Sequence, residues 1–111
     1  MPESFFSLHA LASVTPALGI ARRAARAGQA MMTFFTFTPG SVVPAHTHAH
    51  DQLSVVVRGK AEFTVAGQSR VLGAGEGASL PSGVPHGVRI LDAETEIWDA
   101  WAPLREEYLT E

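Results

Sequence analysis

The chain has 111 residues, a formal net charge of −3, 46% hydrophobic residues and no cysteine. This length fits one domain with a modest core, so we expect one domain over residues 1–111. The sequence has no basic tract of the kind that follows phosphates and no apolar run near the roughly 18 residues of a membrane span. We therefore expect neither a nucleic-acid partner nor a membrane span. The absence of cysteine excludes disulfides and thiolate metal sites.

The N-terminal segment has an acidic residue, Glu3, near its start and no basic region, which is typical of mature protein rather than a signal peptide. We expect a cytoplasmic protein. Phe5, Phe6 and Leu8 are expected to pack onto the rest of the protein or onto a partner subunit.

Residues 18–27 read LGIARRAARA, and their alanine and arginine content favours a helix by propensity. An amphipathic surface helix is the interpretation from these residues alone. Arg22, Arg23 and Arg26 are then expected in solvent, with an active-site role for one of them as the alternative.

From residue 29 onward the sequence predicts short strands separated by turn signals. Residues 29–38 are rich in β-branched and aromatic side chains, and Pro39-Gly40 forms a turn. Further strands are expected at residues 52–58, 61–66, 69–72, 78–81, 87–91 and 95–102. Such spacing is typical of an all-β barrel or sandwich. Residues 104–111 form a polar tail, with room for one helical turn.

Histidines gather in two places between these strands. His46 and His48 alternate, so on a strand both face the same way, and neutral imidazole is the commonest protein metal ligand. On a continuous strand Gln52 would lie about 13 Å from His48, so the chain must turn near residues 49–51. His86 follows in its own Pro/Gly frame, PSGVPHG. A polar patch on a loop is the simpler alternative, and this third histidine favours a metal site over it. No role is assigned to His50.

These residues fall into two spaced motifs that resemble those of the cupin superfamily. The first motif consists of Gly40, His46, His48, Gln52 and Gly59, and the second of Gly75, Pro81, Gly83 and His86. The resemblance implies a single cupin barrel of the jelly-roll type, with its core at about residues 29–103. It also favours a strand over a helix at residues 18–27.

The resemblance further implies one divalent metal ion held by His46, His48, Gln52 and His86. Imidazole with amide oxygen suits Zn, Ni, Fe, Mn or Cu. Two positions depart from the usual pattern: Gln52 stands where glutamate is common, and Ile90 stands where asparagine is common. The glutamine keeps an oxygen ligand and removes a negative charge.

The last predicted strand carries a second group of polar residues. Asp99 and Trp101 share one face of it, and an acid within an apolar strand is costly unless it is paired or functional. Arg105 follows Pro103, where the chain is able to fold over the mouth of a barrel. In the simpler alternative Trp101 is core, Asp99 caps a turn and Arg105 is a surface charge.

Together with the histidine motifs, this segment is similar to the KdgF family of cupins from pectin and alginate degradation. That resemblance implies ring opening of a 4,5-unsaturated uronate to the linear 4-deoxy-5-keto sugar acid. It implies Asp99 as the acid/base, Arg105 on the substrate carboxylate and Trp101 against the sugar ring. Trp101 stands where the family has phenylalanine.

Two other functions stay open on the sequence: an oxidative cupin such as a dioxygenase, and a non-catalytic cupin that binds a small ligand. The predicted partner is in each case a small molecule. We also expect a homodimer, because a short barrel has open edges and Phe5, Phe6 and Leu8 need burial.

Overall fold

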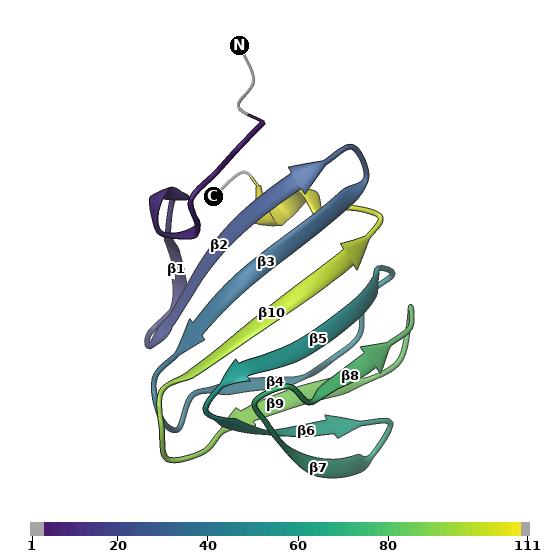
Figure 1. The fold of residues 1–111 in the computed structure, drawn as a ribbon. Coiled ribbons are helices and arrows are strands. Elements are labelled where there is room, and N and C mark those ends of the chain that lie inside the picture. Colours follow the sequence, from purple (N-terminus) through teal and green to yellow (C-terminus); the bar gives the residue numbers. More distant parts are fainter. Residues whose placement is uncertain (1–3, 110–111) are drawn as a thin grey trace.

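The computed structural model describes residues 4–109 and is an all-β fold (Figure 1). Ten strands occur in this part of the chain: β1 (Val14–Ala17), β2 (Ile20–Ala27), β3 (Ala30–Phe37), β4 (Val42–His46), β5 (Asp51–Arg58), β6 (Lys60–Val65), β7 (Gln68–Gly73), β8 (Gly77–Leu80), β9 (His86–Ile90) and β10 (Thr95–Ala102). Two short 3-10 helices, η1 (Leu8–Ala10) and η2 (Glu106–Tyr108), flank them. Neither is long enough to cross a membrane.

The strands form two antiparallel sheets that face each other (Figure 1). One has the order β1-β2-β3-β10-β5-β8 and the other the order β4-β9-β6-β7. Side chains from both inner faces form the core, namely Ile20, Phe37, Val56, Ala61, Phe63, Leu72, Ile90 and Ile97. The predicted all-β fold is therefore confirmed.

Residues 20–27 form a strand rather than a helix, because they pair with a neighbouring strand. β2 pairs with β3 along its whole length, from Ile20 opposite Phe37 to Ala27 opposite Ala30. The cross-strand hydrogen bonds and the burial of Ile20 outweigh the helix propensity of the alanines and arginines. β1 and β2 thus extend the first sheet to residues before 29, where we expected the core barrel to begin.

One prediction for this segment is wrong. Arg22 was expected in solvent, yet only 3% of it is exposed. It lies two residues from Ile20 on the same face of β2, so the alternation of the strand directs its side chain into the barrel.

The inner faces of β5 and β10 change from apolar to polar along the strands. Val56 lies opposite Ile97, Ser54 opposite Asp99, and Gln52 opposite Trp101. The first pair belongs to the apolar core, and the other two pairs give one end of the barrel its polar lining. The register of a single strand pair thus brings together residues that lie more than forty positions apart in the chain.

The outer face of the six-stranded sheet carries apolar side chains. Phe34 contacts Trp98 edge to face, at 5.3 Å between ring centroids, and Phe6 lies 6.5 Å from Phe34. Phe6 thus lies near this face but stays 60% exposed, and Phe5 is 88% exposed, so the expected burial of these two side chains is not seen within one chain. Further large apolar side chains on the same sheet are exposed: Met32, Leu53, Val55 and Val57.

Candidate functional site

A cavity of about 570 Å³ opens between the two sheets. Its polar wall contains His46, His86, Gln52, Ser54 and Asp99. The rest of the wall is mainly apolar and aromatic and includes Phe35, Phe37, Phe63, Val88, Ile97 and Trp101. A concave, mostly apolar space with a few convergent polar groups is typical of small-molecule sites.

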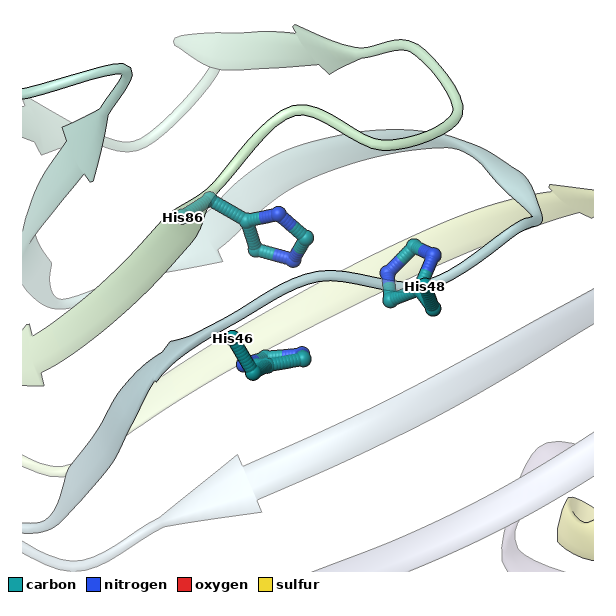
Figure 2. A group of neighbouring side chains, drawn as sticks. All are labelled: His46, His48 and His86. Carbon is teal, nitrogen blue, oxygen red and sulfur yellow. The ribbon is translucent and has the colours of Figure 1, made fainter.

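Three histidines form a cluster, of which His46 and His86 line this cavity (Figure 2). His46 ends β4 and His86 begins β9, and the two residues pair across these strands, with ring centroids 4.5 Å apart. The ring centroid of His48 lies 5.0 Å from that of His86. One nitrogen from each ring lies within 4.8 Å of the others, so the three can share one ion.

His46 and His48 lie close together, but not because they alternate on one strand as expected. β4 ends at His46, so His48 is not on the strand but on the loop that follows (Figure 2). The chain then bends at residues 49–50, close to the predicted turn. Gly83 N donates to the backbone oxygen of His48 at 2.9 Å, which ties this loop to the turn before His86.

Backbone carbonyls fix the orientation of all three rings. The Nδ1 atoms lie at 2.9 Å from Pro44 O for His46, 3.0 Å from His50 O for His48, and 3.1 Å from Val84 O for His86. A carbonyl oxygen only accepts, so each Nδ1 carries the proton and each Nε2 of a neutral ring keeps its lone pair. Such outer contacts are usual for metal-binding histidines.

Gln52 completes a donor set of four. Its Oε1 lies 3.0 Å from His48 Nε2, and both atoms are acceptors when the ring is neutral. Burial lowers the pKa of His48 and of His86, which favours neutral rings. Two lone pairs facing each other at this distance repel unless a cation lies beside them. Three imidazole nitrogens and one amide oxygen therefore fit a divalent transition metal.

Asp99 lies deep in the same cavity and is only 6% exposed. Its Oδ1 accepts a short hydrogen bond from Ser54 Oγ. Burial raises the pKa of Asp99 to about 6, although the hydrogen bonds from Ser54 and Gln52 oppose the shift. A carboxyl group with such a pKa can both donate and accept a proton near neutral pH.

Trp101 and Arg105 lie beside this group. Trp101 Nε1 donates to Thr33 Oγ1 at 2.9 Å, and its ring centroid is 5.2 Å from that of His48. The guanidinium carbon of Arg105 lies 5.0 Å from the Trp101 centroid. Arg105 pairs with Glu107 at 3.0 Å, and its Nη1 is buried without a hydrogen-bond partner within residues 4–109. Arg105 is not itself among the residues that line the cavity.

Sequence reasoning missed Ser54 here, and it placed Arg22 in solvent with an active-site role for one of the three arginines only as the alternative. Arg22 lines the cavity, and its guanidinium carbon lies 4.0 Å from the centroid of Tyr108, a residue of η2 that also lines it. Arg105 is 4.4 Å from the same centroid. Once residues 20–27 are taken as a strand, alternation from Ile20 predicts the inward direction of Arg22. In the same way, alternation from Gln52 along β5 predicts that the Ser54 side chain also points inward.

The chain matches known proteins over most of its length. The cupin domain model matches residues 33–98. The pectin degradation protein KdgF of Dickeya dadantii (strain 3937) is 30% identical over 80 residues, which cover 71% of this chain and 73% of that protein.

Two solved structures have a TM-score of 0.90 to this one. KdgF from Halomonas sp. is 30% identical, over 96% of this chain and 98% of that one. An RmlC-like cupin from Shewanella frigidimarina NCIMB 400 is 27% identical, over 96% of both chains. An oxalate decarboxylase from Bacillus subtilis, 20% identical with a TM-score of 0.80, shows the fold alone. On fold, motif spacing and these matches, the chain belongs to the cupin family and is similar to KdgF.

Proposed function

We propose that the protein is a metal-dependent cupin that opens the ring of a 4,5-unsaturated uronate to the linear 4-deoxy-5-keto uronate. The observation that carries the proposal is the buried Asp99 carboxyl group, with a pKa of about 6, in one cavity with the histidine cluster and Arg22. The similarity to KdgF supports a sugar acid as the substrate class.

His46, His48, Gln52 and His86 would hold one divalent ion, and the donor set suits Zn, Ni, Mn or Fe. When bound, the ion would polarise a hydroxyl or ring oxygen of the sugar as a Lewis acid.

Ring opening is an isomerisation, so every atom of the sugar is kept. The hydroxyl on the anomeric carbon loses its proton, the bond between that carbon and the ring oxygen breaks, and an aldehyde forms. The ring oxygen stays on the carbon of the double bond as an enol. A proton added to the neighbouring carbon converts the enol to the ketone. Asp99 would move a proton in this sequence, since its pKa permits both protonation states.

The remaining residues would hold the substrate. Arg105 would bind its carboxylate through two parallel hydrogen bonds, and the buried, unpartnered Nη1 supports this role. Arg22 adds a second positive charge at the cavity wall. Its guanidinium group, like that of Arg105, lies against the ring of Tyr108. Trp101 would pack its aromatic face against the C–H surface of the sugar.

The direct test measures loss of the C=C absorbance of unsaturated uronate monomers from pectin and from alginate. The zinc-loaded protein is expected to accelerate that loss both in air and under anaerobic conditions, because isomerisation needs no oxidant. Inactivity of the metal-loaded protein on both monomers would refute the proposal. Turnover that consumes oxygen would support the oxidative cupin instead, and tight binding without turnover would support the ligand-binding one.

Arg105→Ala is expected to raise KM by about 10- to 100-fold with little change in kcat. A carboxylate clamp holds the ground state and the transition state alike, and a charged hydrogen bond contributes about 1.5–3 kcal/mol. Arg89→Ala is the matched control, because Arg89 pairs with Glu62 on an exposed surface. A KM for Arg105→Ala equal to that of the control would remove Arg105 from substrate binding.

We also propose a homodimer formed through the outer face of the six-stranded sheet. Leu53, Val55 and Val57 are exposed there, Phe6 lies near Phe34 of the same face, and such apolar surface favours association. Val55→Lys is expected to give a monomer in light scattering at micromolar concentration. Val71→Lys, at an exposed position on β7 of the other sheet, is expected to remain a dimer. A wild-type monomer at this concentration would contradict the proposal.

A further inference from the structure

A series of close polar contacts joins the histidine cluster to Asp99, and two of the three contacts are hydrogen bonds. His48 Nε2 lies 3.0 Å from Gln52 Oε1, Gln52 Nε2 donates to Ser54 Oγ at 2.9 Å, and Ser54 Oγ donates to Asp99 Oδ1. All three residues after His48 are buried, with Ser54 5% exposed. Of the four residues in this series of contacts, only Ser54 has no role in the proposed reaction. We propose that Ser54 is a positioning residue that fixes the Gln52 amide with its oxygen toward the metal site.

The Ser54 hydroxyl carries a single proton, which limits the hydrogen bonds it can donate. A hydroxyl donates one hydrogen bond and accepts through two lone pairs. Ser54 Oγ donates to Asp99 Oδ1, so the one proton of the hydroxyl goes to that carboxyl group. Ser54 Oγ then faces Gln52 as an acceptor, and only the amide nitrogen of Gln52 can satisfy it. The amide oxygen must therefore point the other way, toward His48.

The backbone holds Ser54 in place for this task. On β5 it lies opposite Asp99 of β10 on one side and opposite Ala78 of β8 on the other. Gly77 of β8 approaches so closely that a Cβ atom there would clash with the Ser54 carbonyl oxygen. Ser54 is thus fixed between two paired strands, and its hydroxyl has a defined position relative to both neighbours.

The same proton count favours an amide over a carboxylate at residue 52. A glutamate side chain there would present a second acceptor to Ser54, whose one proton already goes to Asp99. One of the two carboxylates would then stay buried without that hydrogen bond, which is costly. The buried Asp99 on the neighbouring strand β10 thus accounts for Gln52, which stands where the first cupin motif usually has glutamate.

This inference rests on the metal site of the proposed function and is tested by metal affinity alone. Zn²⁺ is titrated into the protein in competition with a chromophoric chelator. Ser54→Ala is expected to weaken Zn²⁺ binding about 10- to 100-fold, as loss of an outer-shell partner typically does. In a Gln52→Ala background, Ser54→Ala is expected to have almost no further effect, because Ser54 acts through Gln52.

Thr33→Val is the matched control. It also removes a buried hydroxyl from the inner face of the same sheet, but Thr33 bonds Trp101 and not Gln52, so Zn²⁺ affinity should not change. If Ser54→Ala does not fold, Ser54→Cys, which keeps the size but is a weaker acceptor, provides the same comparison and should also weaken binding.

Equal Zn²⁺ affinity of the wild type and the Ser54 variant would overturn the inference and leave the metal site standing. An equally large loss in the Gln52→Ala background, or in Thr33→Val, would also overturn it, because the effect would then be general to the fold. A wild type that binds no Zn²⁺ would instead refute the metal site itself, and the inference with it.

Discussion

Asp99→Asn is expected to lower turnover of an unsaturated uronate by about 10²- to 10⁴-fold, the usual contribution of a general acid or base. Asparagine keeps the shape of the side chain and can still accept from Ser54, but it cannot release a proton. Because Asp99 is not a proposed ligand, the variant should keep its metal. Steady-state rates and elemental analysis of the same preparation measure both quantities.

Glu96→Gln is the matched control for this variant. Glu96 lies on the same strand but pairs with Arg58 and Trp98 at the other face of the sheet, so its neutralisation should leave turnover unchanged. Near-full activity of Asp99→Asn with metal bound would show that the proton is moved by another group.

The pKa of Asp99 predicts the direction of a stability effect as well. Burial raises it from 3.8 to about 6, so between these values the folded state binds more protons than the unfolded state. The free energy of unfolding therefore falls as pH rises through this window, and the charged carboxylate costs stability above it. Asp99→Asn removes that cost. In metal-free protein at pH 7 its melting temperature should not be lower than that of the wild type, which separates lost catalysis from misfolding.

The strands and the histidine cluster were largely predictable because they depend on local signals. Turn residues such as Pro39-Gly40 bound the strands, and β3 and β10 begin and end within one residue of the predicted limits. The cluster follows from two short motifs, each of which places its histidines within a few residues of a turn. Local chemistry of this kind can be read from the sequence because no distant segment has to be known.

Arg22 illustrates what local signals cannot supply. Its burial depends on β2 pairing with β3 and on Tyr108, which comes from the opposite end of the chain. Read by propensity, the segment is a helix and the arginines are solvated; only the tertiary pairing makes Arg22 part of the cavity wall. His48 is a second case, since the end of β4 at His46 depends on the pairing with β9.

Ser54 shows a third limit, since its importance depends on register. A shift of β5 against β10 by one residue would turn Ser54 away from Asp99 and leave the acid unpaired. The alternation of β5 indicates that Gln52 and Ser54 face the same side. The residues near Ser54 in the sequence do not indicate that Asp99 is its neighbour, because this depends on how β5 pairs with β10. The individual residues of the candidate site were therefore predictable, but the hydrogen bonds that connect them were not.

His48→Ala and His86→Ala are expected to lose the bound metal. Protein purified without chelator should carry one divalent ion per chain, and each variant should carry little, because loss of an imidazole removes one of four ligands. His9→Ala is the matched control, as His9 lies on η1 outside the cluster. Elemental analysis measures the content and also identifies the metal.

Thermal unfolding gives an independent measure of the same site. An ion that binds only the folded state stabilises it by about 2.7 kcal/mol at a free concentration of 100 Kd. Added Zn²⁺ should therefore raise the melting temperature of metal-free wild type and of His9→Ala, and leave that of His48→Ala and His86→Ala nearly unchanged. Equal metal content and equal stabilisation in all four proteins would assign the ion to another part of the chain. Loss in both cluster variants, with His9→Ala intact, would tie the metal to the nitrogen atoms that the backbone carbonyls of Pro44, His50 and Val84 orient.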